Sequence, residues 1–214
     1  MKTDELIEAL ARGPVAVDAG AATRRRHAFI AAGVAVSAAA MLLLLGPRPD
    51  LNVAIGQPMF WLKLAVPLGL ALPALVALAR LARPGEGATA AWTAIGTLLL
   101  ALEAASLIEL SMTPASDRAA LVAGRTSLAC LLGIVALALP ILVAALAFLR
   151  RMAPTRPRLA GLAAGLAAGA LGAAVYALHC DESTLPFLAT WYVIAIAIPA
   201  VLAAGIGPRL LRWS

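Results

Sequence analysis

The chain contains two cysteines, Cys130 and Cys180, and a histidine, His179, directly precedes the second. Two thiols in an oxidising compartment can form a disulfide, and two thiolates can bind a soft metal ion. Asp181 and Glu182 would add carboxylate ligands beside Cys180 in the second case. The spacing does not choose between these chemistries, and a third arrangement, a buried Cys130 with an unrelated free thiol at Cys180, stays open.

Three more ionisable residues, Lys63, Glu103 and Glu109, lie inside apolar stretches of the chain. A charged side chain within a membrane is costly, so it is either paired or part of a pathway for protons or ions. Lys63 and Glu103 fall at comparable depth below one face, and we expect Lys63 to pair with Glu103 or Glu109, with Arg125 beside them. The alternative is a small ion or metabolite transporter that uses Glu103 and Lys63.

No pattern in the sequence is typical of an enzyme site. The two histidines, His27 and His179, fall on opposite sides of the expected membrane, and no Cys-x-x-Cys pair occurs. A membrane thiol oxidoreductase therefore has little support from the two separate cysteines. We expect no catalytic residue and no resident cofactor, and at most a transient soft metal ion held by Cys130, Cys180 and His179.

Long apolar runs carry these residues. Of the 214 residues, 63% are hydrophobic and 13% charged, and the mean hydropathy is +0.94. These values exclude intrinsic disorder and leave no room for a separate soluble catalytic domain. A membrane span needs about 20 apolar residues. The sequence therefore predicts an all-α domain over 28–207 whose six spans lie at about 28–46, 60–78, 90–110, 126–149, 159–178 and 187–207.

Basic residues predict the orientation of the spans. Of the 17 Lys and Arg residues, 13 lie in the two tails and in the second and fourth loops, the side that membrane insertion keeps in the cytoplasm. Both termini, 1–27 and 208–214, should therefore be cytoplasmic. Cys130 and Cys180 should then lie near the outer face. The first run is too long for a cleaved signal peptide and should be a retained anchor.

The amino-terminal tail has its own amphipathic pattern. Asp4 and Glu5 complement the positive end of a short helix, and Leu6, Ile7 and Leu10 form one apolar edge. Such a helix is marginal alone in water, so it is suited to lie in the groove of a cytoplasmic protein. The alternative is a frayed tail on the membrane surface.

A stripe of glycines marks the fifth run, where Gly161, Gly165 and Gly169 recur at every fourth position. Small residues at this spacing let two membrane helices approach closely. We expect packing within the chain, and association of two copies is the alternative.

Several stretches, in this order, resemble the NrsF family (negative regulator of sigma F). They are MKTDELIEALA at the start, FWLK at 60–63, RLARPG at 80–85, Arg125 with Cys130, RRMAPTRPRLAG at 150–161, HC at 179–180, WY at 191–192 and GPRLLRW at 207–213. The resemblance covers essentially the whole chain.

The resemblance implies a membrane anti-sigma factor in the bacterial inner membrane. It implies that the chain sequesters an extracytoplasmic-function sigma factor and releases it on external metal or oxidant stress, with the paired cysteines taking part in sensing. In this chain Asp4, Glu5, Leu6, Ile7 and Leu10 would bind the sigma factor, and Cys130, Cys180 and His179 would sense the stress. Direct binding to nucleic acid is not expected, and the charge pattern does not decide the oligomeric state.

Overall fold

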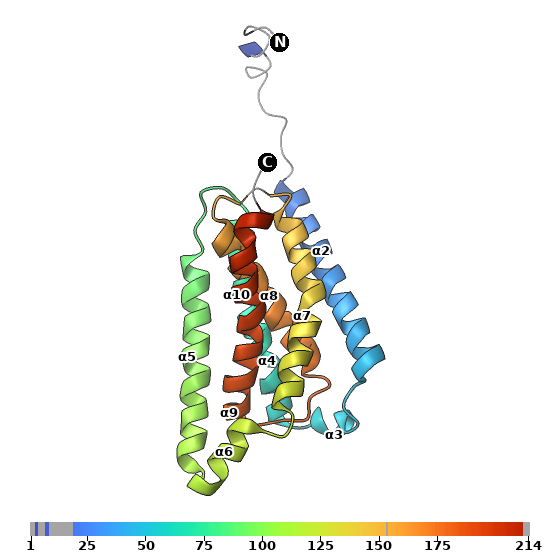
Figure 1. Ribbon diagram of the computed structural model, residues 1–214, viewed down its shortest axis with the longest axis vertical. Helices are drawn as coiled ribbons and strands as arrows, with labels where there is room; N and C mark the ends of the chain where they lie inside the picture. The colour runs from blue at the N-terminus through green and yellow to red at the C-terminus, as the bar shows by residue number, and fades with distance from the viewer. Residues whose placement is uncertain (1–2, 4–6, 9–18, 153, 212–214) are drawn as a thin grey trace.

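The computed structural model describes residues 3, 7–8, 19–152 and 154–211, and these form a helical bundle (Figure 1). In chain order the elements are α2 (Ala19–Ala40), the π-helical turn η1 (Met41–Leu45), α3 (Leu51–Ala54), α4 (Pro58–Leu81), α5 (Thr89–Met112), α6 (Ala115–Ala123), α7 (Ser127–Leu149), α8 (Pro157–Tyr176), α9 (Leu185–Phe187), the π-helical turn η2 (Leu188–Tyr192) and α10 (Val193–Leu210).

Six of these helical stretches are long and apolar enough to cross a membrane, which confirms the predicted all-α, six-span fold. They are Gly20–Leu45, Pro58–Leu81, Thr89–Met112, Ala115–Leu149, Pro157–Tyr176 and Leu185–Leu210. Each overlaps one predicted span. The first begins well before the expected position near Ala28, because α2 continues through the arginines at 24–26.

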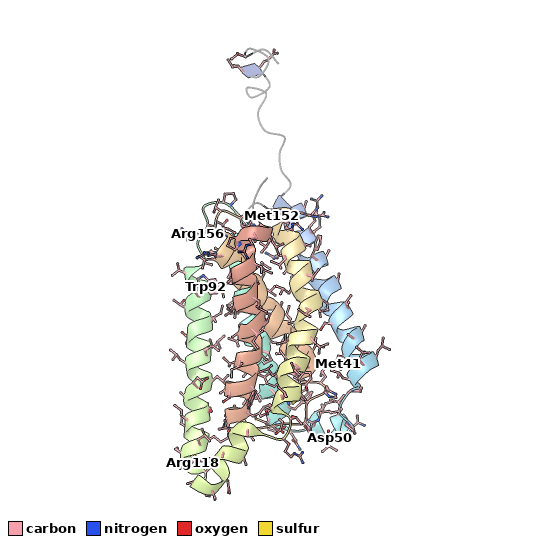
Figure 2. All side chains as sticks on the ribbon, viewed as in Figure 1. Met41, Asp50, Trp92, Arg118, Met152 and Arg156 are labelled. Atoms are coloured by element: carbon pink, nitrogen blue, oxygen red, sulfur yellow. The ribbon has the colours of Figure 1, made fainter. Side chains whose placement is uncertain are left out.

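The two ends of the bundle differ in charge. Arg156 and Met152 lie at the end where α2 begins and α10 finishes, whereas Arg118 and Asp50 lie at the other end (Figure 2). We call the end with Arg156 and Met152 the arginine-rich end, and the end with Arg118 and Asp50 the cysteine end. The loops at the cysteine end contain two features that the sequence analysis did not predict, the short helices α3 and α6.

Helix α8 forms the centre of the bundle and packs against α4, α7 and α10. Of its most apolar stretch, 72% is buried inside the protein, against 17% for the first span. Its glycines explain this close packing: a Cβ built on Gly161 or Gly165 would overlap the backbone of α10 at Ala203 and Pro199. The glycine stripe therefore serves packing within the chain, as expected.

We predict that Gly165→Leu destabilises the bundle by about 1–3 kcal/mol or more, because the added side chain must push α8 and α10 apart. Gly205→Leu is the matched control, since no atom lies within 4 Å of a Cβ built there. The measurement is the unfolding midpoint of each purified variant in detergent. Equal midpoints for the two variants would contradict the close contact of α8 with α10.

Candidate functional site

The two cysteines meet at the cysteine end of the bundle. Cys130 lies in the first turn of α7, and Cys180 follows the last turn of α8. Their Sγ atoms are 3.1 Å apart, and the residues are 0% and 3% exposed. A disulfide bond is about 2.05 Å long, so a shift of about 1 Å would bring the sulfurs to bonding distance. The arrangement with two unrelated thiols is therefore wrong.

The packing of α7 on α8 explains this meeting. Gly133 lies against the ring of Tyr176, and a Cβ at this position would overlap the ring. The first turn of α7 is thereby brought against the last turn of α8. The Cys130 backbone N–H donates to Thr126 at 2.8 Å and the Cys180 N–H donates to Tyr176 at 3.1 Å, so both cysteines are anchored by helical hydrogen bonds.

Lys63 of α4 fixes the loop that carries Cys180. Its side chain is completely buried, and its Nζ donates to the carbonyl oxygens of Cys180 at 2.8 Å and Glu182 at 2.5 Å. The same ammonium lies 5.7 Å from the centre of the Tyr192 ring, a distance typical of a cation–π contact. These contacts satisfy a charge that would otherwise be very costly to bury.

The expected ion pair of Lys63 with Glu103 or Glu109 is wrong for the residues that the structure describes. Glu103 is exposed on the outward side of α5, and Glu109 accepts a hydrogen bond from the backbone N–H of Leu185 at 3.1 Å. Glu103 is therefore exposed, and the Glu109 carboxylate is bonded to the start of α9 instead of to the ammonium. Helix α5 sits at the edge of the bundle (Figure 1).

Arg125 does lie at this end, but its partners are the acidic residues of the loop after α8. Its backbone N–H donates to Glu182 at 2.6 Å, and its guanidinium lies 3.4 Å from the Asp181 carboxylate. Thr126 Oγ1 donates to the same Glu182 carboxylate at 3.4 Å. Glu182 thus connects the start of α7 to the loop that carries Cys180.

The loop after α8 is also tied to the first span. His179 Nδ1 lies 2.8 Å from the carbonyl oxygen of Gly46, where it serves as the donor. The backbone N–H of Arg48 donates to Leu178 at 3.1 Å, and the Arg48 guanidinium reaches the Cys180 carbonyl at 3.4 Å. The loop that carries Cys180 is therefore hydrogen-bonded to the residues that directly follow the first span.

The expected three-residue metal site is not formed. His179 is occupied by its bond to Gly46, and within the described ranges no three His, Cys, Asp or Glu side chains are placed to hold a metal ion together. A site of two thiolates from Cys130 and Cys180 stays a prediction, and two soft sulfur ligands would suit a soft metal ion.

The surroundings favour the thiolate form of Cys180. The hydrogen bond from the Cys130 thiol and then the positive charge of Lys63 lower the pKa of Cys180 below its ordinary value, while burial acts in the opposite direction. The thiolate is the reactive form of cysteine, both as a nucleophile and as a metal ligand. The two cysteines are therefore electrostatically unequal, and the surroundings favour the thiolate at Cys180.

The predicted sigma-binding residues are only partly described. Ile7 is helical and 58% exposed, as a docking residue must be. Asp4, Glu5, Leu6 and Leu10 lie outside the described residues, so their role stays a prediction.

Sequence reasoning missed Arg48 as a site residue. Its guanidinium is buried and forms two 2.6 Å hydrogen bonds with Asp50. These bonds raise the pKa of Arg48 and lower the pKa of the Asp50 carboxyl. The available signal was an arginine in the outer, arginine-poor loops with an acidic residue two positions later.

The fold and site define a polytopic helical membrane protein built around a buried thiol pair. Residues 10–213 match the family described as negative regulator of sigma F, and the chain belongs to this NrsF family of regulatory proteins. It is 41% identical over 213 residues to "Probable anti-sigma-F factor NrsF" of Azospira oryzae (strain ATCC BAA-33 / DSM 13638 / PS), covering 100% of both chains. It is also 41% identical over 222 residues to "Anti-sigma-F factor NrsF" of Caulobacter vibrioides (strain NA1000 / CB15N), again covering 100% of both. No solved structure matches the chain.

The lowered pKa of Cys180 predicts an unusual pH profile of alkylation. An ordinary thiol loses about tenfold in thiolate for each unit of pH below its pKa. Cys180 should keep most of its rate between pH 8 and pH 6, because its thiolate persists below the ordinary pKa of about 8.5. Lys63→Met removes the ammonium but leaves the hydrogen bond from Cys130, so the rate should fall more over the same range than in the unmodified chain.

The rate of iodoacetamide labelling at Cys180 is measured by peptide mass spectrometry on the full-length protein. Burial of Cys180 slows labelling at every pH, so the result is read from the change of the rate with pH and not from its absolute value. Arg118→Gln removes a positive charge at the same end of the bundle and serves as the control. A tenfold loss per pH unit in the unmodified chain would contradict the electrostatic assignment.

Proposed function

We propose that this chain is a membrane anti-sigma factor that holds an extracytoplasmic-function sigma factor at the bacterial inner membrane. Its amino-terminal segment binds the sigma factor in the cytoplasm, and reaction of Cys130 and Cys180 with periplasmic oxidant or metal releases it. The observation that carries the proposal is the buried sulfur pair, 3.1 Å apart, on a loop hydrogen-bonded to the end of the first span.

The anti-sigma role rests on the relatives. Two full-length relatives carry the name anti-sigma-F factor, and the name implies a sigma factor as the partner. The arginine-rich end supports the orientation, since positive residues favour the cytoplasmic side. The amino-terminal segment precedes α2 at that end, so it would reach the cytoplasm directly.

Two reactions of the thiol pair fit the geometry. A hydroperoxide can take two electrons and two protons from the thiols: the O–O bond breaks, an S–S bond forms, and an alcohol and water leave. A soft divalent metal ion can instead form two metal–sulfur bonds while any thiol protons are released. The first brings the sulfurs about 1 Å closer, whereas the second separates them to roughly 4 Å.

Either reaction must displace the loop that carries Cys180. The loop is hydrogen-bonded to Gly46 and Arg48 beyond the outer end of the first span, and the inner end of that span leads to the docking segment. A shift of the first span would change how that segment is presented. The signal then requires two packings of the bundle that bind the sigma factor with different affinity.

The transporter alternative gains no support from the site. It needs Lys63 and Glu103 on a common pathway, but Lys63 is enclosed by backbone carbonyls and Glu103 is exposed on the outward side of α5. The contacts of Lys63 favour a structural role, in which it holds the loop after α8 in place.

Replacing Leu6 and Leu10 with Asp should abolish sigma factor binding, because two charges on the apolar edge would have to be buried in the groove of the partner. The measurement is co-purification of the sigma factor from solubilised membranes. Val15→Asp with Val17→Asp adds the same charges beyond Gly13 and Pro14 and should leave co-purification unchanged. Normal sigma factor recovery with the Leu6 and Leu10 variant would refute the docking role.

Replacing Cys130 and Cys180 with Ser should leave sigma factor binding intact but remove its release by cumene hydroperoxide or Hg²⁺. Release is followed as the sigma factor that leaves washed membrane vesicles with increasing dose. A dose response identical to that of the unmodified chain would remove the thiols from the mechanism.

His179→Ala separates sensing from transmission in the same assay. This variant keeps both thiols but loses the hydrogen bond to Gly46. We expect the thiols to react at the usual dose, as followed by loss of free thiol, while sigma factor release is weakened. Unchanged release would place the route of transmission elsewhere in the bundle.

A further inference from the structure

A cleft opens at the arginine-rich end, on the side of the molecule opposite to the thiols. Its volume is about 340 Å³, and it lies between the first turns of α2 and the end of α7. Arg25 and Phe29 come from α2, and Phe148 and Arg151 come from the end of α7 and the turn that follows. The cleft therefore combines two arginines with an apolar wall.

The two arginines of the cleft have no acidic partner among the described residues. The ion pairs among the described residues are Arg48 with Asp50, Arg83 with Glu86 and Arg125 with Asp181, and none of them includes Arg25 or Arg151. Arg151 is instead positioned by an aromatic ring, with its guanidinium carbon 5.3 Å from the centre of the Phe29 ring. Arg25 and Arg151 are both exposed, so their donors remain available to an anion.

A second, smaller depression adjoins the cleft and extends its positive charge. It shares Phe148 and Met152 with the cleft and is lined by Arg26 and Arg83. Arg83 is bonded to Glu86 at 3.1 Å, whereas Arg26 is bonded to the neutral partner His27 and adds positive charge beside the cleft. Two unpaired guanidinium groups beside each other would be stabilised by one shared anion.

The depth of the cleft points to the source of that anion. Helix α7 ends at Leu149, two residues before Arg151, and α2 carries its arginines directly before the apolar part of the first span. The cleft therefore lies where a spanning helix leaves the hydrocarbon of the bilayer. Phosphate groups of lipids occupy this level, and basic pockets between membrane helices on the cytoplasmic side bind anionic headgroups.

We infer that this cleft binds the headgroup of an anionic glycerophospholipid, with the phosphate held by Arg25 and Arg151. The apolar wall of Phe29 and Phe148 receives the glycerol and the first carbons of the acyl chains. The longer acyl tails stay outside the protein, because α2 and α7 close on each other below the cleft: a Cβ on Gly33 would lie 2.8 Å from the Cα of Ile141. The lipid thus connects the inner ends of these two helices.

The test uses the full-length protein in detergent with three probes: dioleoylphosphatidylglycerol, dioleoylphosphatidylcholine and inorganic phosphate. Binding is followed by native mass spectrometry and by the shift of the unfolding midpoint. We expect saturable binding and a raised midpoint with the phosphatidylglycerol alone. Equal effects of the phosphatidylcholine, or displacement of the phosphatidylglycerol by inorganic phosphate, would overturn the assignment.

Arg25→Gln with Arg151→Gln should weaken phosphatidylglycerol binding about 25-fold, because each arginine near an anionic lipid contributes about fivefold. Arg156→Gln with Arg158→Gln removes the same charge from the same end, outside the cleft, and should change binding much less. If both double variants weaken phosphatidylglycerol binding equally, the binding depends on net charge alone, and the assignment of a defined site is overturned. If the first pair does not fold, the comparison of the three probes on the unmodified chain still decides.

A cytoplasmic protein is the other class of partner that could use this surface, and the same variants distinguish it. The variant with Arg25→Gln and Arg151→Gln should still co-purify with the sigma factor from solubilised membranes. Loss of co-purification with unchanged phosphatidylglycerol binding would identify the cleft as a protein docking surface and overturn the lipid assignment.

Discussion

The geometry of the thiol site depends on one buried charge. The ammonium group of Lys63 has no exposure to solvent, and its hydrogen-bond partners are the carbonyl oxygens of Cys180 and Glu182. Inside a bilayer the N–H groups of an ammonium need hydrogen-bond acceptors from the protein. Each lost hydrogen bond costs several kcal/mol there, because no water replaces the missing acceptor. The loop after α8 is therefore fixed on α4, and its cysteine is held against Cys130. Lys63 fixes the position of the Cys180 loop, and the packing of α7 on α8 brings Cys130 to it.

The spans that meet at this site differ in how much of their surface is buried inside the protein. The most apolar stretch of α8 is 72% buried, and its glycines lie against the backbone of α10. The first span is 17% buried and packs chiefly on α7. The first span therefore has much less of its surface in contact with the rest of the protein than α8 has.

The sequence predicted what depends on length and depth, and failed on what depends on rotation about a helix axis. Hydropathy and arginine counts identified the six spans, the charge difference between the ends and the shared depth of Cys130 and Cys180. Lys63 and Glu103 also share a depth, yet Glu103 turns away from the ammonium because it lies on the outward side of α5. A depth gives one coordinate of a side chain, and the second comes from packing between helices. Arg48 was missed for another reason, because its role depends on a loop conformation that no periodic pattern encodes.

Polar residues lie at both ends of the first span, but in different settings. At the cysteine end, Gly46 and Arg48, which directly follow the span, are hydrogen-bonded to the segment that leads to Cys180. At the arginine-rich end, Arg25 and Arg151 line one cleft, where two positive charges would be stabilised by an anion between them. A headgroup that joins the two arginines would favour the packing in which α2 stays against α7. A displaced loop would favour a different packing, so the two ends bias one element in opposite directions. Because such coupling is reciprocal, the lipid composition of the membrane would set how much thiol reaction is needed to move the span.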